Sequence, residues 1–165
     1  MNDPKPMTEE QIKRSASGLT QRQLSGKVVL VDYEPVWPRL FVRESERINS
    51  TLGRAALSVE HVGSTSVPGL AAKPVIDILL VVANSADESS YVPALEKAGY
   101  ILGIREPDWH EHRMFKGPDS NINLHVFSRG DDEIERMLVF RDWLRENSAD
   151  RDLYLAAKRE LAGRS

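Results

Sequence analysis

The segment EHVGSTSVPGLAAKPVIDILLVV, Glu60 to Val82, decides how this chain is interpreted. It ends in a run of apolar residues, from Val75 to Val82, that is interrupted only by Asp77. A run of this length and composition is typical of a buried strand. An unpaired buried charge costs several kcal/mol, which is comparable with the whole net stability of a domain. We therefore expect Asp77 either to lie at an exposed strand end or to meet a positive charge.

Length and composition indicate one globular domain without thiol chemistry. The chain has 165 residues, of which 41% are hydrophobic, and it contains no cysteine, so disulfides and zinc–thiolate sites are excluded. The formal net charge of −3 gives no general attraction to nucleic acid or to an anionic membrane, and we expect neither partner. No apolar run reaches the ~20 residues of a membrane helix, and the N-terminus has no signal-peptide core, so a cytoplasmic location is predicted.

Hydrophobic periodicity divides the chain into a polar, flexible N-terminal arm, residues 1–25, and one folded domain, residues 26–165. In the arm, Thr8 and Gln11 predict a capping pair. Strands are predicted at 27–33, 56–62, 74–82, 100–104, 113–117 and 122–128, and helices at 34–53, 85–99, 132–147 and from 148 onward. This order favours an α+β fold, with a mixed sheet of about five strands flanked by helices, over a doubly wound parallel sheet.

Two details are predicted for the C-terminal helices. Asp132 with Glu135 has the spacing of a capping pair at the start of the first one. The second one has a stripe of apolar residues that we expect to face inward: Leu153, Ala156, Ala157 and Leu161.

The bend that follows the strand 56–62 suits an anion. Gly63 lets backbone N–H groups approach a ligand without a Cβ in the way. Ser64, Thr65 and Ser66 add three hydroxyl donors, and Lys73 adds a full positive charge. We therefore predict that these five residues bind phosphate or a nucleotide.

Asp77 lies on the strand that comes after this bend. If that strand pairs with 56–62, the carboxylate comes close to the phosphate site, and a magnesium ion between the two is the usual arrangement. The same residues also fit a simple polar turn, with Asp77 in a salt bridge to Lys73 at a strand end. Spacing alone leaves both interpretations open.

Histidine and arginine residues extend the predicted site. If the strands around 61, 77, 113 and 125 share one sheet, His61, Asp77, Arg113 and His125 project onto one face and form a polar pocket. A histidine there serves as general acid, general base or metal ligand, and Arg113 offers a planar fork to phosphate or carboxylate. We predict these four residues as catalytic, and Arg113 also as a phosphate ligand.

Asp77 and His125 are also the predicted metal ligands. Because imidazole suits other ions better than it suits magnesium, the cofactor is predicted to be Mg²⁺ or a histidine-tolerant metal such as Mn²⁺ or Zn²⁺. His110 and His112 form a further candidate pair, although the loop predicted around them gives no fixed geometry.

Five sequence motifs occur in order along the chain: YEPVWPRLF, EHVGSTSVPGLAAKPVIDI, HRMFKG, NLHVF and FRDWLREN. They resemble the GrpB family of the nucleotidyltransferase superfamily, from about Val28 to Ala162. The resemblance implies a mixed sheet flanked by helices and a Gly-Ser turn that holds nucleotide phosphates, which Gly63 and Ser64 match. It also implies three carboxylates, of which Asp77 matches the first, that hold two magnesium ions for attack on the α-phosphate.

The chain departs from this pattern at the other two carboxylate positions. Leu79 stands at the second position and His125 at the third, so the two-metal arrangement is incomplete. Whether the protein is an enzyme is therefore open at this point.

Three hypotheses follow. The first is a nucleotidyltransferase-like protein that binds a nucleotide or phosphorylated small molecule and transfers a nucleotidyl or related group to a small acceptor with a divalent metal. The second is a non-catalytic nucleotide- or coenzyme-binding accessory module, since GrpB-like domains also occur fused to dephospho-coenzyme A kinases. The third is a histidine-based metal enzyme that performs hydrolysis or isomerisation.

Overall fold

The strand β2 (Ile76–Val82) is the centre of the sheet around which the molecule is built. It runs antiparallel to β1 (Ser58–Val62) on one side and parallel to β5 (Ile122–Ser128) on the other. β4 (His112–Lys116) pairs with β5 and β3 (Ile101–Glu106) pairs with β4, both antiparallel. The strand order is therefore β1-β2-β5-β4-β3, and the predicted mixed sheet of an α+β fold is confirmed.

The predicted N-terminal arm, residues 1–25, lies mostly outside the described residues. The structure is a computed structural model that describes residues 7–11 and 29–162. Within the arm, the backbone N–H of Gln11 donates to Thr8 Oγ1 over 3.1 Å, and that of Thr8 donates to Gln11 Oε1 over 2.9 Å, so the predicted capping pair is confirmed. None of the helices in the described ranges is long and apolar enough to cross a membrane.

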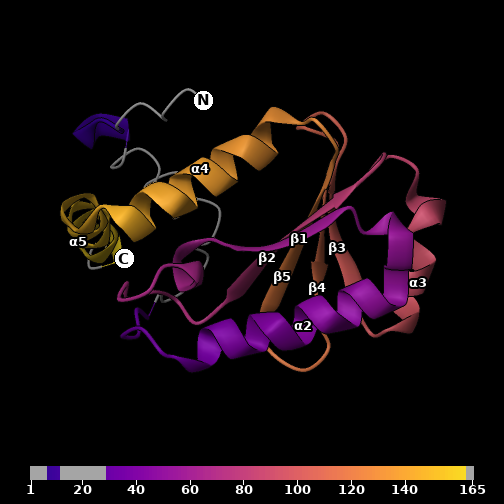
Figure 1. The fold of residues 1–165 in the computed structure, drawn as a ribbon, viewed down its shortest axis with the longest axis horizontal. Coiled ribbons are helices and arrows are strands. Elements are labelled where there is room, and N and C mark those ends of the chain that lie inside the picture. Colours follow the sequence, from indigo (N-terminus) through magenta and orange to yellow (C-terminus); the bar gives the residue numbers. More distant parts are fainter. Residues whose placement is uncertain (1–6, 12–28, 163–165) are drawn as a thin grey trace.

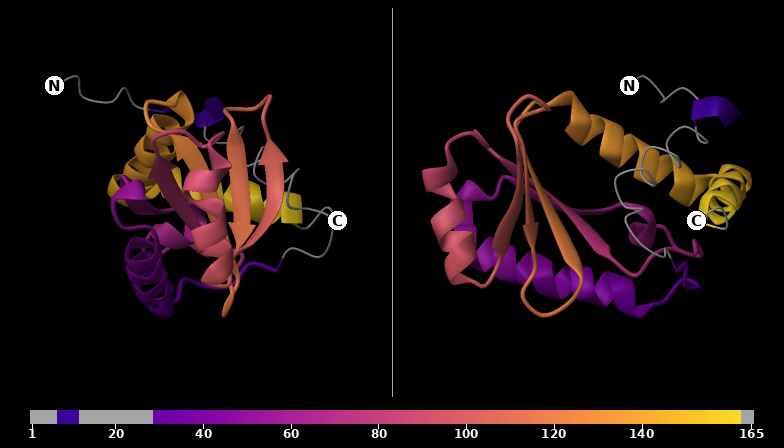
Figure 2. Two further views of the ribbon diagram at one scale, coloured as in Figure 1. Left: turned by 90° about the vertical axis from the view of Figure 1, so that its right-hand side faces the viewer. Right: turned by 180° about the vertical axis from the view of Figure 1, so that it is seen from behind.

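Two helices cover one face of the sheet. α2 (Val36–Leu52) and α3 (Val92–Lys97) lie on this face (Figures 1 and 2). Side chains at alternate positions of β2 point towards them, because successive residues of a strand face opposite sides. The resulting main core includes Trp37, Ile48, Ile76, Ile78, Leu80, Leu95, Phe115 and Leu124.

The opposite face is covered by α4 (Asp132–Glu146), which lies across the sheet from α2 (Figure 1). Its residues Ile134, Met137 and Leu138 pack against a second cluster formed by Val62, Leu79, Val81 and Phe127. β2 is therefore buried on both faces, which explains its almost continuous apolar sequence.

The last helix, α5 (Ser148–Ala162), packs at the C-terminal end of α4 (Figure 1). Its buried residues are Tyr154 and Lys158, whereas Ala156, which we predicted to face inward, is exposed. The buried stripe is thus turned relative to the prediction, because Tyr154 fills a third apolar cluster and Lys158 reaches the bend after β1.

Two predicted elements differ from the structure near the ends of the sheet. The strand predicted at 27–33 is not one: within the described residues from 29 onward, Val31 forms only an isolated antiparallel bridge to Ala72. The helix predicted at 85–99 is mostly irregular, with a single 3₁₀ turn at Glu88–Ser90 before α3 begins at Val92. Pro93 explains this late start, because proline is tolerated in the first turn of a helix but not further inside.

The β3–β4 connection is shorter than the loop predicted around 105–112. β3 runs to Glu106 and β4 begins at His112, so His112 is a strand residue with a fixed direction. The cap of α4 also differs by one residue, since Asp131 rather than Asp132 accepts the hydrogen bond from the Glu133 N–H, over 2.9 Å.

Candidate functional site

The bend after β1 lies directly against the carboxylate of Asp77. Val62, the last residue of β1, is the register partner of Asp77 on β2, and Gly63 follows with φ of +74°. A Cβ placed on Gly63 would lie 2.7 Å from Asp77 Oδ2, closer than such atoms ever approach. Only glycine therefore fits both the backbone conformation and the close contact, and the predicted proximity of the bend to Asp77 is confirmed.

A lysine from the last helix meets the serine of this bend. Lys158 Nζ donates a hydrogen bond to Ser64 Oγ over 2.7 Å, and the hydroxyl of Tyr154 lies 3.5 Å from the same Oγ. Lys158 is only 7% exposed, and in the part of the chain that the structure describes it forms no ion pair. Burial lowers the pKa of Lys158 to about 8, although the negative charge of Asp77 opposes this shift.

The bend, Asp77 and Lys158 line one small cavity of about 30 Å³. Its lining residues are Gly63, Ser64, Thr65, Lys73, Val75, Asp77 and Lys158. This volume holds about two water molecules, so it fits a phosphate oxygen or a small ion, and the rest of a nucleotide would lie outside it. Lys73 and Lys158 both line this cavity, together with the single carboxylate of Asp77.

Two of the three predicted hydroxyl donors hold the bend itself. Thr65 Oγ1 donates to the carbonyl oxygen of Val75 over 3.0 Å and accepts from His61 Nε2 over 3.0 Å, and Ser66 Oγ donates to the carbonyl oxygen of Gly63. Among the three, Ser64 therefore keeps the hydroxyl that points towards the cavity lysine. The binding roles of Thr65 and Ser66 stay predictions that the geometry does not favour.

A row of hydrogen-bonded side chains leads from the cavity across the sheet. His125 Nε2 lies 3.1 Å from Asp77 Oδ1, His125 Nδ1 lies 3.0 Å from His112 Nε2, and His112 Nδ1 lies 2.8 Å from Glu106 Oε1. The four residues come from β2, β5, β4 and β3, and the strand registers direct them to the same face as α4. We call this row, Asp77–His125–His112–Glu106, the histidine relay.

His61 and Arg113 do not share this face, and our prediction that they do is wrong. His61 is the register partner of Ile78 and Arg113 that of Val126, and both partners belong to the core under α2. The His61 ring stacks on Phe41 with centroids 5.0 Å apart, and burial lowers its pKa to about 4, so it is neutral at physiological pH. The strand register explains the error: Ile78 and Val126 each lie one residue after Asp77 and His125, and successive residues of a strand face opposite sides.

Arg113 is committed to carboxylates on its own face. Its guanidinium lies 3.0 Å from Glu88 Oε2 and 2.7 Å from Glu111 Oε2, and the side chain is buried. It is therefore a structural ion-pair residue, and the predicted phosphate-binding role finds no geometric support.

His110 and His112 do not converge on one point. His110 Nδ1 lies 2.7 Å from Asp131 Oδ1, the carboxylate that caps α4, whereas His112 belongs to the relay. The ring of Trp109 contacts both imidazoles, with centroid distances of 4.9 Å and 5.2 Å. The predicted metal pair is therefore not formed.

The side chains around Asp77 do not fit the two-metal arrangement that the resemblance implies. Leu79 is fully buried in the cluster under α4, and both ring nitrogens of His125 are engaged within the relay. Over residues 7–11 and 29–162, no group of three or more histidine, aspartate or glutamate side chains is arranged to hold a metal ion. Asp77 thus stands without the other carboxylates that two magnesium ions require.

Lys158 and Tyr154 were not among the residues predicted from the sequence. They lie 94 and 90 residues after Ser64, so no local motif joins them to it. One signal was present: Tyr154, Lys158 and Leu161 recur at the spacing of one helix face. A lysine within such a stripe indicates a buried cation with a partner elsewhere in the fold.

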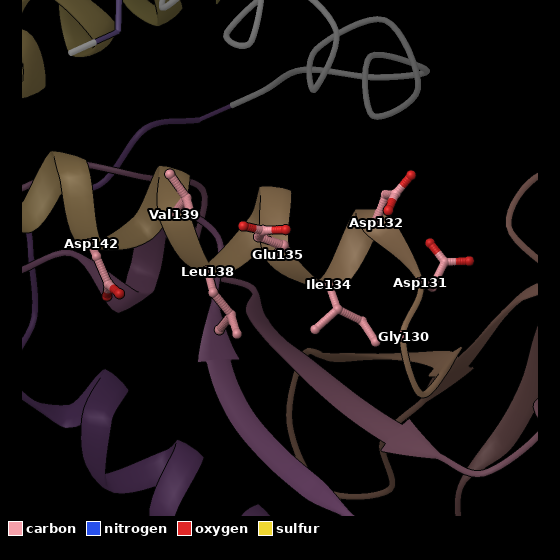
Figure 3. A pocket seen from close by; sticks show the side chains of 8 residues that line it. All are labelled: Gly130, Asp131, Asp132, Ile134, Glu135, Leu138, Val139 and Asp142. Carbon is pink, nitrogen blue, oxygen red and sulfur yellow. The ribbon is translucent and has the colours of Figure 1, made fainter. Parts of the chain in front are cut away.

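A larger hollow of about 350 Å³ lies along α4 and is not part of this site (Figure 3). Its lining contains four carboxylate residues, Asp131, Asp132, Glu135 and Asp142, beside Ile134 and Leu138. Concentrated negative charge repels a phosphorylated ligand, so the small cavity at Ser64 is the better candidate.

Comparison with solved structures defines the class of fold. The Cid1 poly(U) polymerase with bound MgGTP aligns with a TM-score of 0.51 at 10% identity, covering 86% of this chain and 45% of that one. A cytoplasmic RNA terminal U-transferase gives the same TM-score and identity, covering 84% and 42%. The fold is therefore that of the nucleotidyltransferases.

The family follows from closer matches. The family model described as GrpB protein matches residues 27–165, and the crystal structure of GrpB from Enterococcus faecalis aligns with a TM-score of 0.73 at 36% identity, covering 82% of this chain and 83% of that one. A UPF0157 protein of Halalkalibacterium halodurans is 62% identical over 95% of this chain and 80% of its own length. This chain belongs to the GrpB family.

Another group of relatives, the dephospho-CoA kinases, consists of proteins longer than this chain. The dephospho-CoA kinase of Mycolicibacterium paratuberculosis is 32% identical to this chain over 94% of it, but the match covers only 45% of that protein. The similarity thus concerns less than half of the kinase.

Proposed function

We propose that this protein binds a nucleotide or a phosphorylated small molecule through the Gly63–Ser64 bend. The observation that carries the proposal is the buried ammonium group of Lys158, whose hydrogen-bond partner is the neutral hydroxyl of Ser64. A buried charge of this kind is unfavourable unless a counter-ion approaches it. An anionic oxygen in the cavity beside Ser64 would supply that counter-ion.

The surroundings of Lys158 agree with a phosphate ligand. Lys73 lines the same cavity and provides a second cation, and the Gly63 backbone comes close without a Cβ in the way. A bound phosphate would raise the pKa of Lys158 from about 8 towards its ordinary value, because an adjacent anion favours the charged amine. Ligand binding and full protonation of Lys158 would therefore support each other.

The proposal is for binding, and group transfer is not part of it. Nucleotidyl transfer by the two-metal route needs carboxylates where this chain has Leu79 and His125. The Gly63–Ser64 bend and the two lysines suit a phosphate and need no such carboxylates, so binding is the activity that the side chains support best.

A second candidate is an accessory role in coenzyme A metabolism. It is favoured by the dephospho-CoA kinases, which include a segment similar to most of this chain. Dephospho-coenzyme A carries phosphates and an adenine nucleotide, so the same bend would bind it. The cytoplasmic location predicted from the sequence agrees with either ligand and stays a prediction.

A thermal-shift screen tests the proposal. Wild-type protein is titrated with ATP, dephospho-coenzyme A and pyrophosphate, each with EDTA or with magnesium. A ligand at ~100 times its dissociation constant stabilises the fold by about 2.7 kcal/mol, which is readily detected. Preference for dephospho-coenzyme A over ATP would favour the accessory role.

The Lys158→Gln variant separates specific binding from general charge effects. We expect it to abolish the stabilisation, whereas Lys97→Gln, which removes an exposed lysine of α3, leaves it unchanged. If no phosphorylated ligand stabilises wild type, or if both variants respond like wild type, the proposed function is wrong.

A further inference from the structure

A row of three polar side chains crosses the sheet beside the phosphate cavity. Asp77 on β2 lines the cavity and is the register partner of Asn123 on β5, and Asn123 is the register partner of Lys116 on β4. Register partners on neighbouring strands point to the same face of a sheet, with the strands about 4.8 Å apart. We call Asp77, Asn123 and Lys116 the polar row. It begins at the cavity and leads away from it.

The amide of Asn123 has donors without an acceptor. Lys116 Nζ donates to Asn123 Oδ1, which fixes the oxygen of the amide on the side of Lys116. The residue is only 8% exposed, yet its Nδ2 has no acceptor among residues 7–11 and 29–162. Nearly all buried polar groups have a hydrogen-bond partner. An acceptor brought by a ligand would supply the one that Asn123 lacks.

The ammonium group of Lys116 is also available to an anion. The side chain is exposed, and within the described ranges it forms no ion pair. The carboxylate of Asp119, in the hairpin that follows β4, is bonded to Arg47 of α2 instead. An ammonium group has three N–H donors, of which Asn123 accepts one. Two charged donors of Lys116 therefore lie beside the unused donors of Asn123.

We infer that Asn123 and Lys116 form a second anion subsite, which binds the next anionic group of a ligand whose first phosphate lies at Ser64. This inference rests on the proposed function and narrows its ligand class. Asn123 lies one strand spacing, about 5 Å, beyond Asp77 of the cavity. The two anionic groups must therefore follow each other closely, as the two phosphates of a diphosphate do.

The residue beyond Lys116 limits the subsite to one further anionic group. Ile101 on β3 is the register partner of Lys116 and is 68% exposed. β3 is the edge of the sheet, so the row ends there. An apolar side chain offers no hydrogen bond to a third phosphate. The ligand class is therefore a diphosphate whose remaining part is uncharged near Ile101.

The carboxylate of Asp77 lies between the two subsites, and both of its oxygens have neighbours within the protein. Oδ1 lies 3.1 Å from His125 Nε2, and Oδ2 lies against the backbone of Gly63. Lys158 lines the cavity on one side of Asp77, and Lys116 follows on the other. A lysine on either side reduces the repulsion between this carboxylate and a bound diphosphate.

A series of inorganic phosphates tests the inference without the rest of a ligand. Calorimetry of the full chain, in EDTA at constant ionic strength, compares orthophosphate, pyrophosphate and tripolyphosphate. We expect pyrophosphate to bind about tenfold or more tightly than orthophosphate, because it gains hydrogen bonds to a charged group. Tripolyphosphate should bind about as tightly as pyrophosphate. A further large gain with the third phosphate would contradict the limit set by Ile101.

Variants separate the subsite from the general effect of ligand charge. Lys116→Gln, at an exposed side chain, should remove the gain of pyrophosphate over orthophosphate, and Lys116→Arg should retain it. Asn123→Asp, which keeps the shape and replaces the amide donors with an acceptor, should also remove it. Lys97→Gln, an exposed lysine of α3, is the matched control and should keep the full gain.

The outcomes distinguish this inference from the proposed function. If the wild type binds none of the three phosphates, the proposed function fails and the second subsite fails with it. If Lys158→Gln abolishes pyrophosphate binding while Lys116→Gln and Asn123→Asp keep the full gain, the cavity binds phosphate and only the second subsite is wrong. An equal loss of the gain in Lys116→Gln and Lys97→Gln would also overturn the inference, because it would show a general charge effect.

Discussion

At the scale of single residues, Gly63 is a position in the site where no side chain fits. Its φ of +74° and its contact with Asp77 leave no room for a Cβ. We predict that Gly63→Ala displaces the Asp77 carboxylate, weakens the hydrogen bond to His125 and lowers the free energy of unfolding in urea.

Gly69 is the matched control for this substitution. It also has a positive φ, +83°, but a Cβ there meets nothing within 4 Å. Gly69→Ala should therefore cost only the backbone strain, about 1–2 kcal/mol, and Gly63→Ala clearly more. Equal losses in the two variants would show that the contact with Asp77 has no energetic weight.

We predict that the buried charge of Lys158 lowers the free energy of unfolding. Its pKa is about 8 when folded and about 10.5 when unfolded, so between these pH values the unfolded state binds more protons. The free energy of unfolding should therefore rise with pH from about 8 to 10.5, and the full cost of the buried charge is present below pH 8. That cost is on the order of 3 kcal/mol.

The variant Lys158→Met keeps the length of the side chain and removes the charge. It should be more stable than wild type at pH 7, lack the rise in stability above pH 8, and bind no pyrophosphate. Chemical denaturation across this pH range measures the first two effects. A less stable variant at pH 7 would show that the lysine stabilises the fold.

Residue patterns predicted part of this site. Gly63, Ser64, Asp77 and His125 were predicted together, and the distances between them confirm that they are neighbours. Lys158 was not predicted, because its contact with Ser64 depends on how α5 docks. The docking angle of a helix cannot be inferred from the spacing of residues in its own sequence.

At the scale of elements, α5 contributes to the site through a small apolar cluster of its own. Val67, Leu70, Leu144 and Tyr154 form this cluster apart from the main core, and Trp143 Nε1 donates to Asp150 Oδ2 over 2.6 Å. In the part of the chain that the structure describes, the docking of α5, and with it the position of Lys158, depends on this cluster rather than on the main core.

Leu144→Ala tests this dependence. Loss of a buried leucine costs about 2–5 kcal/mol when the surroundings do not collapse. We expect hydrogen exchange to accelerate in α5 while the amides of β2 stay protected, and phosphate-ligand affinity to fall as Lys158 becomes less ordered. Uniform acceleration throughout the sheet would instead show that α5 and the sheet unfold as one unit.

Elements with a strong period were predicted well, and irregular ones were not. The strand at 122–128 has the predicted bounds, because alternation along it is clear. The segment 85–99 contains helix-forming residues, but Pro93 and the hydrogen bond from Tyr91 to the Ser85 carbonyl oxygen hold its first part in an irregular path. His112 was predicted to lie in a loop, but it pairs with Glu106 as a strand residue. This pairing sets the length of the turn at 107–111, and it cannot be inferred from the residues of the turn alone.

At the scale of the whole molecule, the sheet brings distant residues into one site. The parallel pairing of β2 with β5 sets Asp77 beside His125 across 48 residues of sequence, and the antiparallel β3–β4–β5 meander extends the row to Glu106. The fold class was predictable because it follows from the number and order of elements. Which histidines share a face was not, because it depends on strand register.

A crystal structure of the protein grown with ATP tests the central claim most directly. We predict that a phosphate oxygen accepts hydrogen bonds, at about 3 Å, from Lys158 Nζ and Ser64 Oγ, with the phosphate against the Gly63 backbone. A nucleotide bound elsewhere on the surface, with Lys158 still donating to Ser64 in an unchanged cavity, would contradict the account.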